Sequence, residues 1–439
     1  MIPQEVRTLL ARLESAGHQA WAVGGCVRDT LRRAAPSDWD VTTDARPEQV
    51  MSLFGQAAIP TGLKHGTVTV CAGETRVEVT TFRRDGTYSD HRRPDAVRFS
   101  TSLEEDLARR DLTVNAMAMD LRGHICDPFG GQEDLSHRVL RCVGEPIRRL
   151  DEDALRIMRT LRFASALGFT VEAHTAAALH RRAPLLRDIA AERLLSETDR
   201  LLCGAHVLPV LLAYPDVLGV FLPELLPCVG LDQRNRHHLY DVWEHTARSV
   251  AAIAPEPVLR WAMLLHDVGK PAALQATGCM YTHDRLGADI ARGILERLRY
   301  PSAVIRDVTA LIRNHMFDLR TEAKENTIRL WLQEMGIERS RQLIALRRAD
   351  VHGSGRIEGP VESADRWERI LESMIAAGAP FEERQLAVTG ADIAKALGIP
   401  PSPAIGRIKE GLLRHCAKRP EDNNKTVLLR LSRDLVNNS

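Results

Sequence analysis

The residues with the most evident chemistry lie near the N-terminus, in the segment VGGCVRDTLRRAAPSDWD, which ends on Asp38 and Asp40. If residues 37–41 form a strand, alternate side chains share one face, so the two carboxylates point the same way. Two like charges this close repel each other. A hard divalent cation such as Mg²⁺, which prefers oxygen ligands and is completed by substrate phosphates, would relieve the repulsion. We therefore expect Asp38 and Asp40 to be catalytic residues that bind Mg²⁺.

A glycine pair, Gly24-Gly25, opens the same segment. Glycine has no Cβ atom, so the backbone can approach a phosphate closely. A helix that starts near Cys26 would add its N-terminal amides and the positive charge of Arg28 at the same place. A hairpin turn with two solvated aspartates would explain either feature alone. Both features within one turn–helix–turn–strand unit favour nucleotidyl transfer instead.

Several strands and a helix must position these residues. Apolar residues at helical spacing over residues 3–17 predict a first helix, and alternation over residues 19–23 predicts a strand that leads into the glycine pair. Residues 67–71 and 76–82 read as a strand pair joined by a short turn. Glu78 lies among β-branched neighbours, so it is either a third catalytic carboxylate that faces the metal or a residue at the rim.

Length and composition limit the class of protein. A chain of 439 residues is expected to hold about three domains. With 59 basic and 58 acidic residues, any RNA-binding surface must come from local clusters, and 5% aromatic residues argue against stacking as its main contact. The eight scattered cysteines include no CxxC pair and fit a cytoplasmic protein with reduced thiols. No apolar run is long enough to span a bilayer, so we expect no membrane partner.

A further segment, LARRDLTVNAMAM, follows the predicted strands. This segment, the glycine pair and the DWD carboxylates resemble motifs of the class II tRNA nucleotidyltransferase/poly(A) polymerase family. The resemblance covers nearly the whole chain. Within the family, the chain is most similar to the bacterial CCA-adding enzymes with an internal HD domain. The family reads RRDxTxNAxA here. The resemblance implies that Arg110 contacts the nucleotide and that Asp111 and Asn115 support the sugar and the fold. An N-capping role for Asp111 or Thr113 is compatible with this support.

The polar, charged segment 83–100 reads as a surface loop. In the family that it resembles, a mobile loop at this place is needed to switch from C to A addition. Its presence disfavours an enzyme that adds only CC. From Asp151 onward the periodicity is helical almost to the end. The expected fold class is therefore α+β, with an N-terminal nucleotidyltransferase head (a mixed sheet with flanking helices) followed by an elongated all-α body that contains an HD domain.

Four charged residues recur every three positions where the helical body begins: Asp153, Arg156, Arg159 and Arg162. On a helix they would form a drifting stripe, which alone would suit a solvated, salt-bridged face. Cytosine and adenine both present an amine donor beside a ring-nitrogen acceptor, whereas guanine and uracil carry a carbonyl in place of that amine. A carboxylate beside a guanidinium can therefore bond C and A and discriminate against G and U by about 10²–10³. The family's EDxxR motif matches Asp153 and Arg156 and implies this role, with Arg159 and Arg162 on ribose or triphosphate.

A later family motif, ERxRxE, is only partly present. Glu192, Arg193 and Glu197 match it, but Leu195 replaces the second arginine. We expect the three charged residues to brace the preceding helix without help from position 195.

The middle of the chain carries a second constellation, centred on His266-Asp267. With sixteen histidines in the chain, a single one is weak evidence. This pair, however, lies in an apolar helix predicted over residues 259–268 and ended by Gly269 and Pro271, where polar side chains need partners. Imidazole and carboxylate ligands from separate helices suit a divalent metal, with Mg, Mn, Ni or Co as candidates. The segment resembles the HD phosphohydrolase domain, which implies the ligands His245, His266, Asp267 and Asp350, with His283 and His315 for a second ion or a phosphate.

The C-terminal part predicts a helical hairpin whose second helix is basic. It is similar to the family's C-terminal segment, which implies phosphate contacts of tRNA with Lys409, Arg414, Lys418 and Arg419. The expected domains are a catalytic head, a nucleotide-selecting neck, an HD domain and a tRNA-binding tail, at 1–140, 141–225, 226–355 and 356–439.

The sequence thus predicts an enzyme that adds C, C and A to the tRNA 3′ end from CTP and ATP, with a second, phosphohydrolase activity on RNA ends. Three alternatives stay open. The chain could be a poly(A) polymerase of the same family, although the intact HD region argues against this. It could add A only. It could also be a metal phosphohydrolase whose head binds RNA without catalysis.

Overall fold

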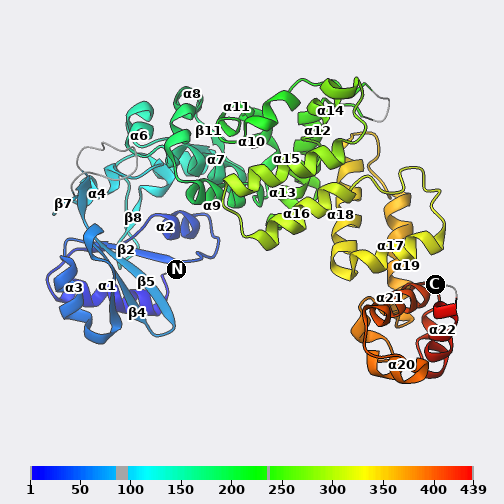
Figure 1. Ribbon diagram of the computed structural model, residues 1–439. Helices are drawn as coiled ribbons and strands as arrows, with labels where there is room; N and C mark the ends of the chain where they lie inside the picture. Colours follow the sequence, from blue (N-terminus) through cyan, green and yellow to red (C-terminus); the bar gives the residue numbers. More distant parts are fainter. Residues whose placement is uncertain (1, 86–96, 235–237, 438–439) are drawn as a thin grey trace. The chain divides into compact units, whose positions relative to one another are not determined.

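The computed structural model describes residues 2–85, 97–234 and 238–437 (Figure 1). The chain forms two compact units, Met1–Leu226 and Pro227–Ser439. Division into four domains stays a prediction. In the described part of the chain, no helix is both long and apolar enough to cross a membrane.

The first unit opens with a seven-stranded sheet of order β3-β4-β5-β2-β1-β8-β9. Strands β2 and β5 run parallel, whereas every other described pair in this sheet is antiparallel, so the sheet is mixed as expected. The bounds of its strands are β1 Ala20–Val23, β2 Trp39–Thr43, β3 Ala58–Gly62, β4 Thr67–Ala72, β5 Thr75–Thr81, β8 Ala118–Met119 and β9 Ile125–Cys126.

Alternation along β2 and β5 separates an apolar face from a polar one. Trp39 and Val41 on β2, with Val77 and Val79 on β5, are buried in one core. Helices α1 (Gln4–Ser15) and α3 (Pro47–Phe54) contribute to the same core (Figure 1). Because successive side chains point to opposite faces, the residues between these apolar ones face away from α1 and α3. That opposite face carries the predicted carboxylates.

The remaining elements of the first unit are a two-stranded ribbon, a second short parallel pair and a series of helices. These elements are α2 Gly25–Leu31, β6 Arg83–Asp85, β7 Val97–Phe99, α4 Leu103–Ala108, α5 Gly131–His137, β10 Val139–Leu140, α6 Pro146–Glu152, α7 Leu155–Leu167, β11 Thr170–Val171, α8 Ala173–Arg182, α9 Ala191–Leu202, α10 Val207–Ala213 and α11 Pro215–Leu218.

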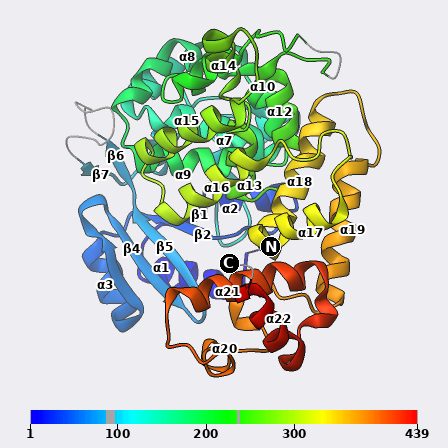
Figure 2. The same cartoon turned by 45° about the vertical axis from the view of Figure 1, so that its right-hand side comes forward.

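In the described residues of the second unit, all regular secondary structure is helical. Helices α12, α13, α15, α16 and α18 pack side by side (Figures 1 and 2), and α20, α21 and α22 enclose a smaller core of their own. The bounds are α12 Val242–Ala252, α13 Pro257–Leu265, α14 Lys270–Thr277, α15 His283–Arg297, α16 Ser302–Asn314, α17 Glu325–Met335, α18 Ile337–Gly353, α19 Glu362–Ala376, α20 Gly390–Leu397, α21 Pro403–Lys418 and α22 Lys425–Asn437.

Candidate active site and candidate metal centre

Three carboxylates gather on the polar face of the sheet. Asp40 on β2 lies directly opposite Glu78 on the parallel strand β5. The strand expected at 37–41 begins two residues later, at Trp39, so the exposed Asp38 lies just before it. The pKa of Asp40 is raised to about 6, chiefly by burial; the charge of Arg110 opposes this rise, and the charges of Asp38 and Glu78 add to it. A cluster of oxygen ligands whose like charges repel fits a hard divalent cation such as Mg²⁺.

The backbone of Gly24 brings the glycine pair against Arg110. Gly24 has a φ of +81°, which side chains rarely adopt, and a Cβ atom added there would lie 3.0 Å from Arg110 Nη1. Gly25 begins α2, as expected for a helix that follows the pair. The Nε atom of Arg110 is buried and has no hydrogen-bond partner among the described residues. The guanidinium of Arg110 therefore lies beside both Gly24 and Asp40.

A chain of hydrogen bonds connects α2 to α7. Arg28 Nη1 donates to Asn115 Oδ1 at 2.7 Å, and Asn115 Nδ2 donates to Asp111 Oδ1 at 3.1 Å. Arg159 Nε on α7 donates to Asp111 Oδ2 at 2.9 Å. Burial alone would raise the pKa of Asp111, but Arg159 and the hydrogen bonds hold it well below its usual range. The carboxylate is thus ionised and fixes Arg159, while Asn115 fixes Arg28.

Phe163 on α7 is a residue of this region that sequence reasoning missed. The guanidinium carbons of Arg28, Arg159 and Arg162 lie 5.1, 5.7 and 4.1 Å from the centre of its ring. Such contacts attract each cation to the electron-rich face of the ring. The only signal in the sequence was its position beside the arginines of the predicted stripe.

The predicted helical stripe of Asp153, Arg156, Arg159 and Arg162 differs from what the structure shows. Helix α6 ends at Glu152, and Asp153 has an extended backbone with φ −143°, so Asp153 does not lie on the helix that carries Arg156. Asp153 Oδ2 accepts a hydrogen bond from Arg193 Nη2 at 3.2 Å. Arg156, only 9% exposed, pairs with Glu152 at 2.6 Å and donates to the backbone oxygen of Arg109 at 2.8 Å. The expected acceptor and donor are neighbours, but each is engaged by another residue.

Helix α9 carries the incomplete ERxRxE motif, and one of its charged residues contacts α7 while another binds a residue between α6 and α7. Arg193 binds Asp153, and Glu197 forms an ion pair with Arg162 at 3.2 Å. Leu195, in place of an arginine, is half-buried.

In the second unit, four helices and the turn after α13 bring six ligand-type side chains together. His245, His266 and Asp267 have ligand atoms within 4.8 Å of one another, and Asp267 forms a second such group with His283 and His315. Asp267 joins the two groups because Oδ2 lies 3.2 Å from His266 Nε2 and Oδ1 lies 3.2 Å from His283 Nε2. The sixth side chain, Asp350 on α18, has Oδ1 3.2 Å from His245 Nε2.

The orientation of three histidines suits metal binding. The Nδ1 atoms of His266, His283 and His315 each lie within 2.6–2.8 Å of the backbone oxygen three residues earlier. A hydrogen bond there fixes the tautomer and leaves Nε2 to face the centre. Burial, together with nearby His266 and His283, lowers the pKa of His315 to about 3, so this imidazole is neutral. The donor set fits one or two divalent ions, with Asp267 between them.

One local prediction about this centre was wrong. Helix α13 ends at Leu265, so His266 and Asp267 lie in the turn after it and not inside an apolar helix. Pro271 lies in the first turn of α14 and does not end the preceding helix. Two further polar side chains reach this turn that sequence reasoning missed: Lys270 donates to Asp267 and, at 2.7 Å, to Gln233 Oε1.

The predicted RNA contacts lie on and just after α21. Arg414, Lys418 and Arg419 are exposed. Lys409 differs, because its Nζ atom is held by Glu383 Oε2 at 2.7 Å.

Comparisons with known proteins agree with this organisation. Residues 20–141 match the family model of the poly A polymerase head domain, residues 168–228 match the probable RNA and SrmB-binding site of polymerase A, and residues 236–352 match the HD domain. The chain is 36% identical to the CCA-adding enzyme of Geobacillus stearothermophilus over 425 residues, which are 96% of this chain and 94% of that protein. It is 33% identical to the CCA-adding enzyme of Lactiplantibacillus plantarum over 437 residues, 98% of this chain and 96% of that protein. It also resembles the crystal structure of the Bacillus stearothermophilus CCA-adding enzyme in complex with CTP, with a TM-score of 0.76 and 32% identity over 100% of both chains.

Proposed function

Because the chain belongs to the family of CCA-adding enzymes, we propose that it adds C, C and A in turn to the 3′ end of tRNA, from CTP and ATP and without a nucleic-acid template. The observation that supports this most is the meeting of Asp40 and Glu78, opposite each other on β2 and β5, with Arg110 and Gly24. Nucleotidyl transfer requires carboxylates for a cation, an arginine for the phosphates and a backbone that lets a phosphate approach, all in one place.

Each residue then has a defined part in the reaction. Asp38, Asp40 and Glu78 hold Mg²⁺, which would lower the pKa of the attacking 3′-hydroxyl and stabilise the leaving pyrophosphate. Arg110 binds the nucleotide phosphates beside Gly24, where the missing Cβ leaves room. The remaining arginines, Arg28, Arg159 and Arg162, line the same region around Phe163 and are kept in place by Asn115, Asp111 and Glu197.

The decisive experiment offers the protein a tRNA that lacks CCA, with labelled CTP and ATP supplied separately and together. We expect two C additions from CTP alone and the complete CCA end from the mixture. A poly(A) polymerase would leave CTP unused and extend with A repeatedly. An A-adding enzyme would act only on a tRNA that already ends in CC. Either of these two outcomes would refute the assignment to CCA addition.

We also propose that Asp153 and Arg156 select the nucleotide, which requires them to exchange their present partners, Arg193 and Glu152, for the base. Asp153→Asn introduces an amide donor that can bond the carbonyl of U or G. We expect misincorporation of UTP and GTP, relative to CTP and ATP, to rise about 10–100-fold, since one mismatched polar edge costs about 1–3 kcal/mol. Single-nucleotide incorporation assays measure this ratio.

The matched control for this prediction is Asp151→Asn, because Asp151 lies two residues away on α6 and pairs with Arg182 at 2.8 Å. The control is expected to keep the parent ratio. Unchanged discrimination in Asp153→Asn would remove Asp153 from base selection.

The second unit supports a second proposal, a metal-dependent phosphodiesterase or phosphatase acting on 2′,3′-cyclic or terminal phosphates of RNA ends. Its ligands are His245, His266, Asp267 and Asp350, and we assign His283 and His315 to a second ion. A divalent ion there (Mg, Mn, Ni or Co) would activate a water for attack on the phosphoester. The support is the shared carboxylate of Asp267, which contacts histidines of both groups.

The proposal also includes the residues that contact tRNA and a cytoplasmic location. Exposed Arg414, Lys418 and Arg419 would contact tRNA phosphates, which fixes position without reading sequence. All eight cysteines are free thiols, which suits the reducing cytoplasm.

A further inference from the structure

One fully buried carboxylate lies behind the proposed active site. Asp106 on α4 is 0% exposed. Its Oδ1 atom accepts hydrogen bonds from Arg109 Nε at 3.0 Å, Arg109 Nη2 at 2.7 Å and the backbone N–H of Arg83 at 3.4 Å. Its Oδ2 atom accepts from Thr42 Oγ1 at 3.1 Å and Arg110 Nη2 at 3.4 Å. A single side chain thus joins strand β2, the start of β6 and the RRD segment.

The charge on Asp106 needs an explanation. Burying a carboxylate is costly unless it is paired and hydrogen-bonded. Burial would raise the pKa of Asp106, but Arg109 and Arg110 lower it below its ordinary value, so the group is ionised. It is not needed to cap α4, because the hydroxyl of Ser102 accepts the N–H of Glu105 there. Its contacts instead point to the two arginines.

The contacts of Asp106 with Thr42 and Arg110 lie next to the proposed active site. Thr42 lies two residues after Asp40 on the same strand, so both side chains share a face. Arg110 is bound to Asp106 through Nη2, whereas its Nη1 lies against Gly24. The guanidinium is therefore anchored at one end and keeps its buried Nε without a partner among the described residues.

We propose that Asp106 is a positioning residue for nucleotide binding: it holds the guanidinium of Arg110 between Gly24 and Asp40, where it would bind the phosphates of the incoming nucleotide. Asp106 itself does not touch the nucleotide. The inference rests on the proposed nucleotidyl transfer and adds to it the residue that fixes the phosphate-binding arginine.

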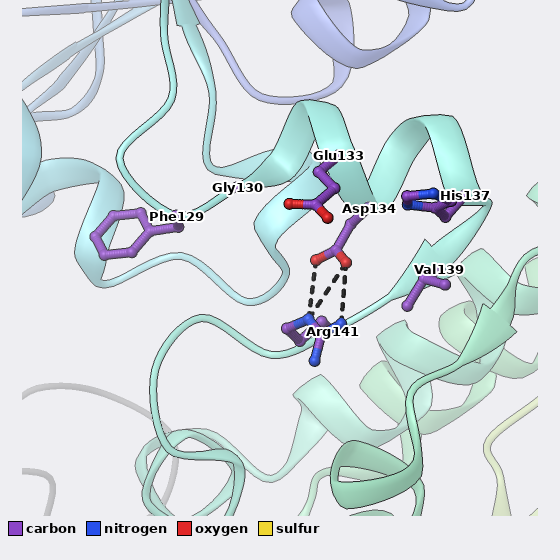
Figure 3. A pocket seen from close by; sticks show the side chains of 7 residues that line it. All are labelled: Phe129, Gly130, Glu133, Asp134, His137, Val139 and Arg141. Atoms are coloured by element: carbon purple, nitrogen blue, oxygen red, sulfur yellow. Dashed lines mark hydrogen bonds and ion pairs between the residues drawn. The ribbon is translucent and has the colours of Figure 1, made fainter.

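The chain offers a matched control, Asp134 on α5. It is 6% exposed, accepts a hydrogen bond from the Thr113 hydroxyl at 2.7 Å and pairs with Arg141 at 3.1 Å. Figure 3 shows this ion pair at a hollow that is also lined by Phe129 and His137. Asp134 has the same kinds of partner as Asp106, a threonine and an arginine, but in the part of the chain that the structure describes it contacts none of the proposed nucleotide-binding residues.

The test compares Asp106→Asn with Asp134→Asn in CTP and ATP addition to a shortened tRNA. We expect Asp106→Asn to raise KM for both nucleotides about 10–100-fold, the effect of losing one or two hydrogen bonds to a charged group, with a smaller change in kcat. Asp134→Asn is expected to lower Tm about as much as Asp106→Asn does. It should keep KM within about twofold, because the Asp134 carboxylate has only a structural role. Equal KM values for the two variants would overturn the proposal.

A double-mutant cycle makes the test independent of general destabilisation. In an Arg110→Ala background, Asp106→Asn should have almost no further effect on KM, because the group that it positions is gone. Full additivity of the two changes would contradict the proposal.

If Asp106→Asn does not fold, Thr42→Val decides, since it removes one hydrogen bond to Asp106 Oδ2 and should still raise KM about threefold. Failure of the unsubstituted protein to add any nucleotide would instead remove the proposed function, and this inference with it.

Discussion

Replacing Asp40 with asparagine is expected to lower the rate of CTP and ATP addition by about 10³-fold or more, because a catalytic metal supplies several kcal/mol of charge stabilisation and each 1.36 kcal/mol is about tenfold. Asn keeps the size of the side chain but removes the charge that faces Arg110 and lies opposite Glu78. The hydrolysis proposed for the HD centre should keep its parent rate. Primer extension on a shortened tRNA and phosphate release from a 2′,3′-cyclic RNA end measure the two activities in the same preparation.

Two neighbouring substitutions sharpen this prediction. Asp44→Asn is the control, since Asp44 follows β2 but binds His18 at 3.2 Å and the backbone of Gln19 at 2.9 Å. Glu78→Gln then decides between the two roles considered for Glu78. If Glu78 is a metal ligand, this variant should lose about as much activity as Asp40→Asn. If Glu78 is a rim residue, the activity should stay within a few-fold of the parent. Normal addition by Asp40→Asn would refute the assignment of the head as the transferase.

The opposite result is expected for the second unit. Asp267→Asn should reduce the proposed metal-dependent hydrolysis by about 10³-fold and leave the proposed CCA addition unchanged, because Asp267 belongs to both ligand groups. Chelation should abolish the hydrolysis, and adding back Mg²⁺, Mn²⁺, Ni²⁺ or Co²⁺ one at a time identifies the ion.

Buried Asp267 could also matter for folding, so the control is Asp241→Asn. Asp241 caps α12 through a hydrogen bond from the N–H of Glu244 at 2.7 Å, and its loss should lower Tm without removing hydrolysis. His283→Asn offers a milder change that affects the proposed second ion alone. Hydrolysis that survives both Asp267→Asn and chelation would show that this cluster is not a metal centre of the kind proposed.

Local patterns in the sequence predicted most of the elements. The alternation that predicted strands at 67–71 and 76–82 is observed in β4 and β5, and the helix predicted over 3–17 is α1. The mixed sheet, the helical body and the HD domain are likewise confirmed. These features follow from periodicity and from motifs whose residues lie close together in the chain.

Side-chain partners brought together by the fold could not be predicted in this way. Arg156 is held by the backbone oxygen of Arg109, 47 residues away, so its helical spacing did not reveal that it is engaged. Asp106 gave no signal because an acidic residue in the first turns of a helix is ordinary. Its importance comes from Thr42 and Arg110, which only the folded chain places beside it.

The parallel alignment of β2 with β5 has a consequence for the population of molecules in a cell. Because side chains alternate, sliding β2 by one residue would bring Asp40 into the core and Val41 out of it. Each large apolar side chain that lost its burial would cost about 1.5–3 kcal/mol, a sizeable share of the 5–15 kcal/mol that keeps a typical domain folded. Copies with misplaced carboxylates would therefore unfold more readily than correctly paired ones. A shift of β2 that would disable the proposed site therefore also lowers the stability of the fold.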